Sequence, residues 1–244
     1  MPISGISQGL GIGGGASATI SGSPSGGGGT PFANADSLNL DGTDTYATLD
    51  STITLTGAYS ISAWINYEVN TGSGWSFWFG THSVTAMYID TVSQKLAFRV
   101  GSGYVYSSAS DFPKQEWNLL VVTRDASDEV NAHVTNASGT AVVATFTDTN
   151  DPSIARLWRA PPAPNNLYFA GGIDEIAVWN GTELSAAQIA TIYNSGAPDD
   201  LTSFSPTHWW RCGDSNGGTG TDITDVVAGN DMTLANTSIV SSVP

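Results

Sequence analysis

The stretch that decides the fold of this chain is Gly171-Gly172-Ile173-Asp174-Glu175-Ile176-Ala177-Val178-Trp179-Asn180, followed by Glu183-Leu184-Ser185-Ala186-Ala187-Gln188-Ile189. It predicts an apolar strand, a tight turn at Asn180-Gly181 and one short amphipathic helix. Ser185 is expected to cap the helix, because Gln188 three residues later completes a capping box. We expect the helix to end before the Gly and Pro at 196–198 and to lie across the edge of a sheet.

The residues before this stretch carry the pattern of short β-strands separated by turn residues. Alternate side chains of residues 59–67 are apolar, whereas residues 117–123 are apolar on both faces, as in a strand inside a sandwich. Further strands are expected at residues 37–40, 46–49, 75–79, 86–89, 95–100, 104–107, 129–135, 141–146 and 166–169. This spacing, without helices in between, predicts an all-β, antiparallel sandwich. Two more strands after residue 200 are too few for a second core, so residues 32–244 are expected to form one domain.

Residues 1–31 differ in composition from the rest of the chain. They are rich in Gly and Ser, include a run of four glycines at 26–29, and carry almost no charge. Such a segment buries too little apolar surface to fold alone. A disordered tail is the simpler alternative; our hypothesis is an arm that anchors the chain to neighbouring subunits. Fully extended, it would reach on the order of 100 Å.

The charge balance and the single cysteine exclude several classes of protein. Charged residues make up 12% of the 244 residues, and the net charge is −15. Because an acidic surface repels polyanions, nucleic acid and anionic membranes are not expected as partners. The lone Cys212 excludes an intrachain disulfide and a zinc site built from cysteine pairs. No signal peptide and no apolar run of the ~18 residues that span a bilayer are visible, so we expect assembly in a host cytoplasm, as part of a virion.

Four segments together resemble the laminin-G-like branch of the concanavalin-A-like lectin/glucanase superfamily, from about Leu38 to Leu234. They are residues 38–46 with 61–65, residues 117–123, residues 172–179 with the helix, and residues 208–211 through 229–234. The resemblance implies a jelly-roll sandwich, a fold that serves sugar binding, protein binding, hydrolysis and scaffolding alike. The order of Gly-rich arm, domain and C-terminal section is similar to structural proteins of tailed bacteriophages. It implies a homo-oligomeric capsid or tail protein whose arm binds other virion proteins.

The sequence offers no array of catalytic residues, so we expect a protein that is not an enzyme. Superfamily glucanases look like Glu-x-Asp-x-x-Glu on one strand, and that array is missing here. Asp174 and Glu175 are adjacent, so in a regular strand they would face opposite sides of the sheet. A Gly-x-Ser-x-Gly motif is absent as well, and His82, His133 and His208 lie far apart without metal-ligand spacing.

Calcium is the metal that the residues suit best, because it prefers oxygen ligands from carboxylates, amides and carbonyls. Two loops are rich in such groups, and the resemblance adds one strand residue as a further contributor. The candidate calcium ligands are Asp41, Asp44, Asp174, Asp225, Asn230 and Asp231. The alternative is that the acidic loops are ordinary turn formers.

Exposed tryptophans are the candidates for sugar binding, because a sugar ring stacks on an aromatic face. We consider Trp75, Trp78 and Trp158; packing in the core is the alternative for each. Two functions follow as hypotheses. The first is a non-enzymatic structural or decoration protein of a bacteriophage particle. The second is a carbohydrate-binding adhesion module that recognises host surface glycans.

Overall fold

The computed structural model describes residues 32–68, 75–81, 85–108, 112–159, 167–236 and 238–244. The arm that the sequence predicts at residues 1–31 lies outside the described residues. Within the described ranges, no helix is long and apolar enough to cross a membrane.

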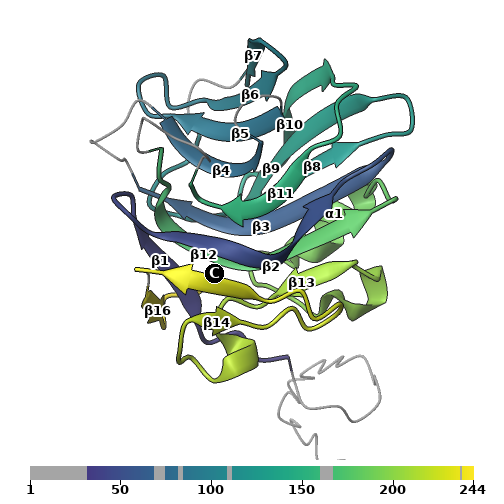
Figure 1. Cartoon of the computed structure of the whole chain (residues 1–244). Helices are drawn as coiled ribbons and strands as arrows, with labels where there is room; N and C mark the ends of the chain where they lie inside the picture. Colours follow the sequence, from purple (N-terminus) through teal and green to yellow (C-terminus); the bar gives the residue numbers. More distant parts are fainter. Residues whose placement is uncertain (1–31, 69–74, 82–84, 109–111, 160–166, 237) are drawn as a thin grey trace, which may run out of the picture. The chain divides into compact units, whose positions relative to one another are not determined.

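The largest element is an antiparallel sheet that forms one layer of the sandwich (Figure 1). Its central strands come from the two segments that are most apolar in the sequence. In spatial order the strands are β10 (Gly139–Thr147), β9 (Glu129–Asn136), β8 (Trp117–Arg124), β3 (Tyr59–Tyr67), β12 (Ala170–Asn180), β1 (Ser37–Asp41) and β16 (Ser238–Val240), with β13 (His208–Trp210) also paired to β12.

Two four-stranded antiparallel sheets form the opposite layer. The first has the order β11 (Ser153–Leu157), β2 (Tyr46–Thr54), β15 (Met232–Ala235) and β14 (Asp222–Ile223). The second has the order β4 (Trp75–Thr81), β5 (Thr85–Asp90), β6 (Leu96–Val100) and β7 (Gly103–Tyr106). They meet where the amide of Trp158 donates a hydrogen bond to the carbonyl of Trp78, at 3.1 Å. The main core fills the space between the two layers.

The central strands of the large sheet are buried on both faces. The side chains of Ile61 and Ile65 enter the main core, whereas Trp64 points to a second cluster on the opposite face. That cluster lies under helix α1 (Ala186–Tyr193), whose Ile189 and Ile192 are buried. The helix therefore packs on the central strands β3, β8 and β12, and not at a sheet edge as we predicted.

The caps of α1 show which sequence signals were decisive. Ser185 and Gln188 form the predicted capping box, with both reciprocal hydrogen bonds present. The helix ends earlier than expected, because Asn194 adopts the left-handed conformation and closes it. Two short 3-10 helices follow, η1 (Leu201–Phe204) and η2 (Asp214–Asn216).

Three strands of the described residues were missed, β11 and two of the four strands after residue 200, and one strand was wrongly predicted. Residues 153–157 form β11, a segment for which we predicted no strand. Of the strand predicted at 166–169, the described part forms only an isolated bridge between Tyr168 and Arg159. β11 is short and pairs irregularly with β2, so its residues do not alternate between apolar and polar.

Candidate functional site

The tryptophans proposed as sugar platforms are not available on the surface. Trp78 is 3% exposed and Trp158 is 0% exposed, and both belong to the main core. A register shift in β4 between Phe77 and Phe79 sends Trp78 inward together with Phe79. A left-handed backbone at Trp158 (φ 65°) turns that side chain into the core, which the preceding Leu157 also enters. The prediction is therefore wrong for these two, while the side chain of Trp75 lies outside the described residues.

Two tyrosines on the edge strand β7 present the exposed aromatic surface that the tryptophans lack. Tyr104 is 39% exposed and Tyr106 is 43% exposed, and their ring centroids lie 6.5 Å apart. As residues i and i+2 of a strand they occupy the same face. The guanidinium of Arg99 on β6 lies over the Tyr104 ring, and its Nη1 donates to the Tyr104 hydroxyl at 3.2 Å. The sequence signal was an aromatic pair at strand spacing, which we interpreted only as a strand.

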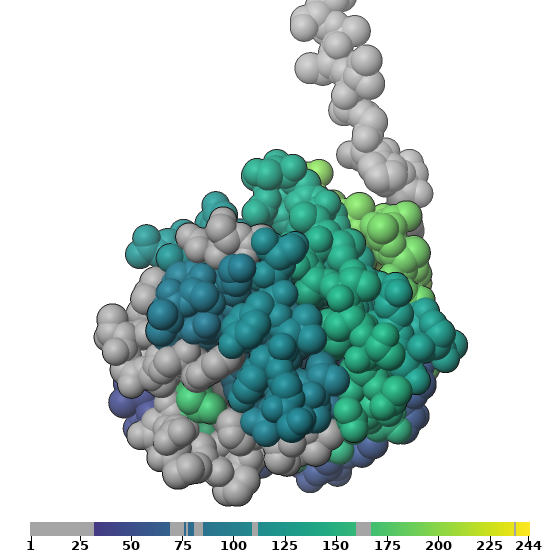
Figure 2. Space-filling view, turned by 90° about the horizontal axis from the view of Figure 1, so that it is seen from above, coloured from purple at the N-terminus to yellow at the C-terminus, as the bar shows by residue number. Residues whose placement is uncertain are grey.

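A cavity of about 240 Å³ begins one residue beyond Tyr106, at the edge where the two layers meet. In Figure 2 the segments of β5–β7 and β8–β10 lie beside each other on this face of the molecule. The cavity is mostly apolar, with three hydroxyls and one amide among its lining side chains. The lining residues are Leu96, Ser107, Phe112, Pro113, Val134, Asn136, Ser138, Gly139, Thr140, Ala141 and Val143.

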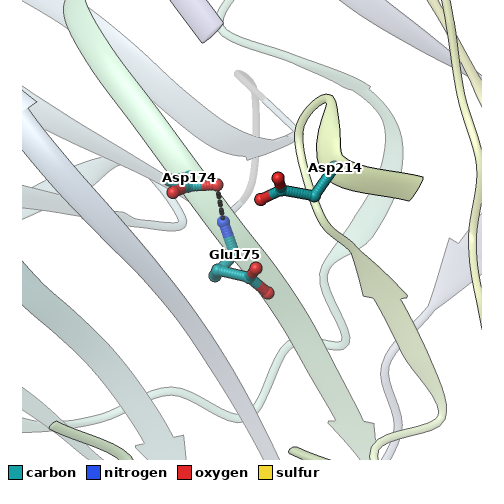
Figure 3. Close-up of side chains that lie close together, drawn as sticks. All are labelled: Asp174, Glu175 and Asp214. Atoms are coloured by element: carbon teal, nitrogen blue, oxygen red, sulfur yellow. Dashed lines mark hydrogen bonds between the residues drawn. The ribbon is translucent and has the colours of Figure 1, made fainter. Parts of the chain in front are cut away.

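Three acidic side chains meet inside the fold, against our expectation for two of them. Glu175 has a left-handed backbone (φ 45°), and the pairing of β12 with β3 shifts register between Asp174 and Ala177. This bulge breaks the alternation of the strand, so Asp174 and Glu175 do not point to opposite sides. Asp214 reaches toward them from η2, as Figure 3 shows, and the carboxylate oxygens lie within 4.8 Å of one another. We call these three residues the acidic trio.

Protein donors hold most oxygens of the acidic trio. Asp174 accepts hydrogen bonds from the Glu175 amide at 2.8 Å and from Asn34 Nδ2 at 3.0 Å. Glu175 accepts from Trp209 Nε1 at 2.5 Å and from Arg211 Nε at 3.0 Å. Burial raises the pKa of Asp174 well above its usual range, and it raises that of Glu175 to about 7 although Arg211 opposes the shift. Burial raises the pKa of Asp214 as well.

The acidic trio does not suit glycoside hydrolysis, but it suits a cation. Asp174 is 0% exposed and Glu175 is 2% exposed, so a sugar cannot reach them. Arg211 supplies one positive charge against three carboxylates, which leaves buried negative charge to be neutralised. Asp214 Oδ2 and Asn34 Oδ1 are buried without a hydrogen-bond partner among the described residues. Hard oxygens with spare acceptor capacity are the chemistry that calcium prefers.

The other calcium candidates act as turn formers in the structure. Asp225 accepts hydrogen bonds from the amides of Val227 and Ala228 and from His208, and its own amide donates to Asp231. Asn230 bonds both backbone groups of Ser51, and Asp41 caps its own turn through the amides of Thr43 and Asp44. Of the predicted ligands, only Asp174 belongs to the one group of acidic, His or Cys side chains in the described ranges that could share a metal ion.

Comparisons with known proteins agree with this architecture. A laminin-G-type family model, described as the concanavalin A-like lectin/glucanases superfamily, matches residues 41–190. No curated protein sequence matches the chain. A solved structure from Bacteroides ovatus, provisionally described as a carbohydrate-binding protein, has a TM-score of 0.66 at 15% identity, covering 86% of this chain and 61% of that one. This chain thus spans less than two thirds of the length of that protein.

Two further solved structures share parts of the fold. The heptameric SAP-like pentraxin of Limulus polyphemus has a TM-score of 0.49 at 11% identity, covering 65% of this chain and 82% of that one. Domains LG4-5 of the mouse laminin α1 chain have a TM-score of 0.41 at 16% identity, covering 63% and 43%. The family match runs from the end of β1 into α1, over more than half of the sequence. The chain therefore belongs to the concanavalin A-like lectin/glucanase superfamily.

Proposed function

We propose that this chain is a non-catalytic carbohydrate-binding module that contacts glycans through the tyrosine rings of β7. The observation that carries the proposal is the exposure of Tyr104 and Tyr106 side by side on an edge strand. Aromatic rings that are partly exposed on one face of a sheet offer the apolar face on which a sugar ring stacks. The description of the Bacteroides ovatus protein as carbohydrate-binding supports the same role.

Rigid support makes these rings suitable for binding. Tyr88 of β5 lies 6.3 Å from Tyr104, ring centroid to centroid, and it is buried behind it. Arg99 also holds Tyr104, through stacking and a hydrogen bond. A platform that is already ordered loses little conformational entropy when a sugar binds.

A glycan array with the full chain tests the proposal. We expect selective binding to a subset of glycans, weakened at least about tenfold by Tyr104→Ala/Tyr106→Ala because the stacking surface is lost. The matched control is Tyr104→Phe/Tyr106→Phe, which keeps both rings and should retain most of the binding. Binding that survives the alanine variant would move the site elsewhere, and an array without any bound glycan would refute the function.

A second candidate function is the structural or decoration role in a bacteriophage particle. The observation that favours it is the Gly-rich composition of residues 1–31 ahead of the domain. In this proposal the arm binds other capsid or tail proteins, the domain projects from the particle, and the chain forms a homo-oligomer. The two roles are compatible, because a lectin-like domain on a virion is placed to meet host glycans.

We also propose that the acidic trio holds a structural calcium ion. The supporting observations are the excess of buried carboxylates over cations and the two buried oxygens without hydrogen bonds. The ion would connect β12 to η2 and to the segment that contains Asn34. Its role would be stability, since the buried trio lies away from the tyrosines of β7.

A further inference from the structure

Two arginines beside strand β2 stack on one tyrosine ring. Arg156 lies in β11, and Arg159 follows shortly after the end of that strand. Their guanidinium carbons lie 5.1 and 5.0 Å from the ring centroid of Tyr46 in β2. The left-handed turn at Trp158 explains the pairing, because it sends the side chains of Leu157 and Trp158 into the core and leaves the flanking arginines on the outer side.

Two other arginines of the chain have carboxylate partners, which Arg156 and Arg159 lack among the described residues. Arg124 is paired with Asp128 and Asp151, and Arg211 is paired with Glu175 and Asp214. Neither Arg156 nor Arg159 has an ion pair with any residue in the described ranges. In a chain with a net charge of −15, two neighbouring guanidiniums without a carboxylate are unusual.

The proximity of the two positive charges favours a bound anion at this place. Because both guanidiniums lie about 5 Å from one centroid, they can be no more than about 10 Å apart. That separation is comparable to the Debye length of about 8 Å at physiological ionic strength, so the two like charges still repel each other. A bound carboxylate or sulfate would relieve the repulsion and form charge-assisted hydrogen bonds with guanidinium donors. The more distant acidic residues are screened and oppose such a contact only weakly.

The sheet continues from this pair with side chains that suit sugar hydroxyls. Arg156 is directly opposite Thr48 in the register, Thr48 is opposite Thr233, and Thr233 is opposite Asp222. Thr233 and Asp222 are exposed, and Thr48 is half-buried, whereas their sequence neighbours Ala47, Met232 and Ile223 are buried in the core. The four strands lie side by side in Figure 1. A polar row about 14 Å long, three strand spacings, therefore runs across the outer face and ends at the arginines.

We propose that Tyr46, Arg156 and Arg159 form a second binding site, which takes the single carboxylate or sulfate of an acidic sugar. This site lies in a different sheet from the tyrosines of β7 and has a different chemistry. That the anion is carried by a sugar rests on the proposed function and on the hydroxyl-rich row. An isolated acidic sugar fits better than a long polyanion, because the net charge of the chain repels an extended negative polymer.

A matched pair of sugars tests the site directly. The full chain, labelled with ¹⁵N, is titrated with D-glucuronate and with D-glucose, which differ in one carboxylate, while the Nε–H signals of the arginines are followed by NMR. We expect glucuronate to bind with Kd on the order of 1 mM, at least about tenfold tighter than glucose, and to shift the signals of Arg156 and Arg159. Raising the salt to about 0.5 M should reduce this preference. Glucose 6-sulfate tests the sulfate form against inorganic sulfate.

The control removes the same amount of charge from residues outside both proposed sites. Arg156→Gln/Arg159→Gln should abolish the preference for glucuronate, whereas Lys95→Gln/Lys114→Gln should keep it, because neither lysine belongs to the site. Equal binding of both sugars, a preference that survives in the double variant, or inorganic sulfate binding as tightly as glucose 6-sulfate would overturn the acidic-sugar site. Neutral glycans on the array would then still support the proposed function. An empty array together with no glucuronate binding would refute both.

Discussion

At the scale of single residues, backbone conformation decides which side chains can act. Glu175 and Trp158 both adopt the left-handed region, at φ 45° and φ 65°. Each departure changes the side to which a side chain points. At Glu175 it brings a carboxylate beside Asp174, and at Trp158 it buries an indole that would otherwise be a sugar platform. An observed outlier of this kind is where a functional hypothesis should begin.

The acidic trio predicts that calcium and protons stabilise the fold in different pH ranges. The pKa of Glu175 is raised from 4.5 to about 7 in the folded chain, so without a cation the folded state binds more protons than the unfolded state between these values. Stability then falls as the pH rises through this window. Calcium should restore this stability at the pH values where the carboxylates are ionised. We expect calcium in place of EDTA to raise Tm on the order of 5 °C at pH 7.5 and much less at pH 5, by differential scanning fluorimetry.

Two variants separate this effect from other titrating groups. Desolvation lowers the pKa of buried His133, so its titration changes stability in the direction opposite to that of Glu175. His133 is present in every sample. Asp174→Asn removes one carboxylate of the trio and should lose most of the calcium response. Asp44→Asn changes an exposed candidate outside the trio and should keep it. A Tm that is equal in calcium and EDTA at both pH values would eliminate the structural calcium.

At the scale of elements, local sequence signals were sufficient for the regular strands and for the helix. The alternation of β3, the two-sided apolar character of β8 and the capping box of α1 all predict the observed elements. β11 and the bulges of β4 and β12 were not predictable in this way. Their form depends on pairing with distant strands, and a shift of one residue moves every following side chain to the other face. The tryptophan and carboxylate predictions failed for that reason.

The close packing of β12 against β3 makes a testable demand on Gly171. Its backbone has φ 127°, and a Cβ there would lie 2.1 Å from the carbonyl oxygen of Asn66. Gly139 has a similar φ of 113°, but a Cβ there meets nothing within 4 Å. We expect Gly171→Ala to lower the free energy of unfolding by more than about 3 kcal/mol, and Gly139→Ala by only about 1–2 kcal/mol. Urea denaturation measures both, and equal losses would show that backbone strain alone accounts for the effect.

At the scale of the whole molecule, the buried groups that we assign to stability lie apart from the exposed groups that we propose for binding. Asp174, Glu175, Trp78 and Trp158 are buried, whereas the tyrosines of β7 and the Tyr46 arginine pair lie on the outer side of the two smaller sheets. Alternation and turn spacing along the chain predicted the all-β class, and the resemblance of four segments predicted the family. Neither signal located the surface that we propose for binding, because exposure is a property of the assembled sheets.

Deletion of residues 1–31 tests the virion role at this scale. The shortened chain should stay soluble and folded, with an unchanged Tm, because the described residues of both hydrophobic clusters begin at Phe32. If the arm is the anchor, the shortened chain should no longer be incorporated when particles assemble in its presence. The full chain is the control in the same assembly reaction. Equal incorporation of both chains would refute the anchoring role without affecting sugar binding.

The most direct test of sugar binding by the tyrosines is an aromatic ¹³C NMR titration of the full chain with the best ligand from the glycan array. The proposal predicts shifts in the ring signals of Tyr104 and Tyr106 that saturate with the ligand, while those of the buried Trp78 and Trp158 stay in place. Saturating shifts at the tryptophans, with the two tyrosines unchanged, would contradict it.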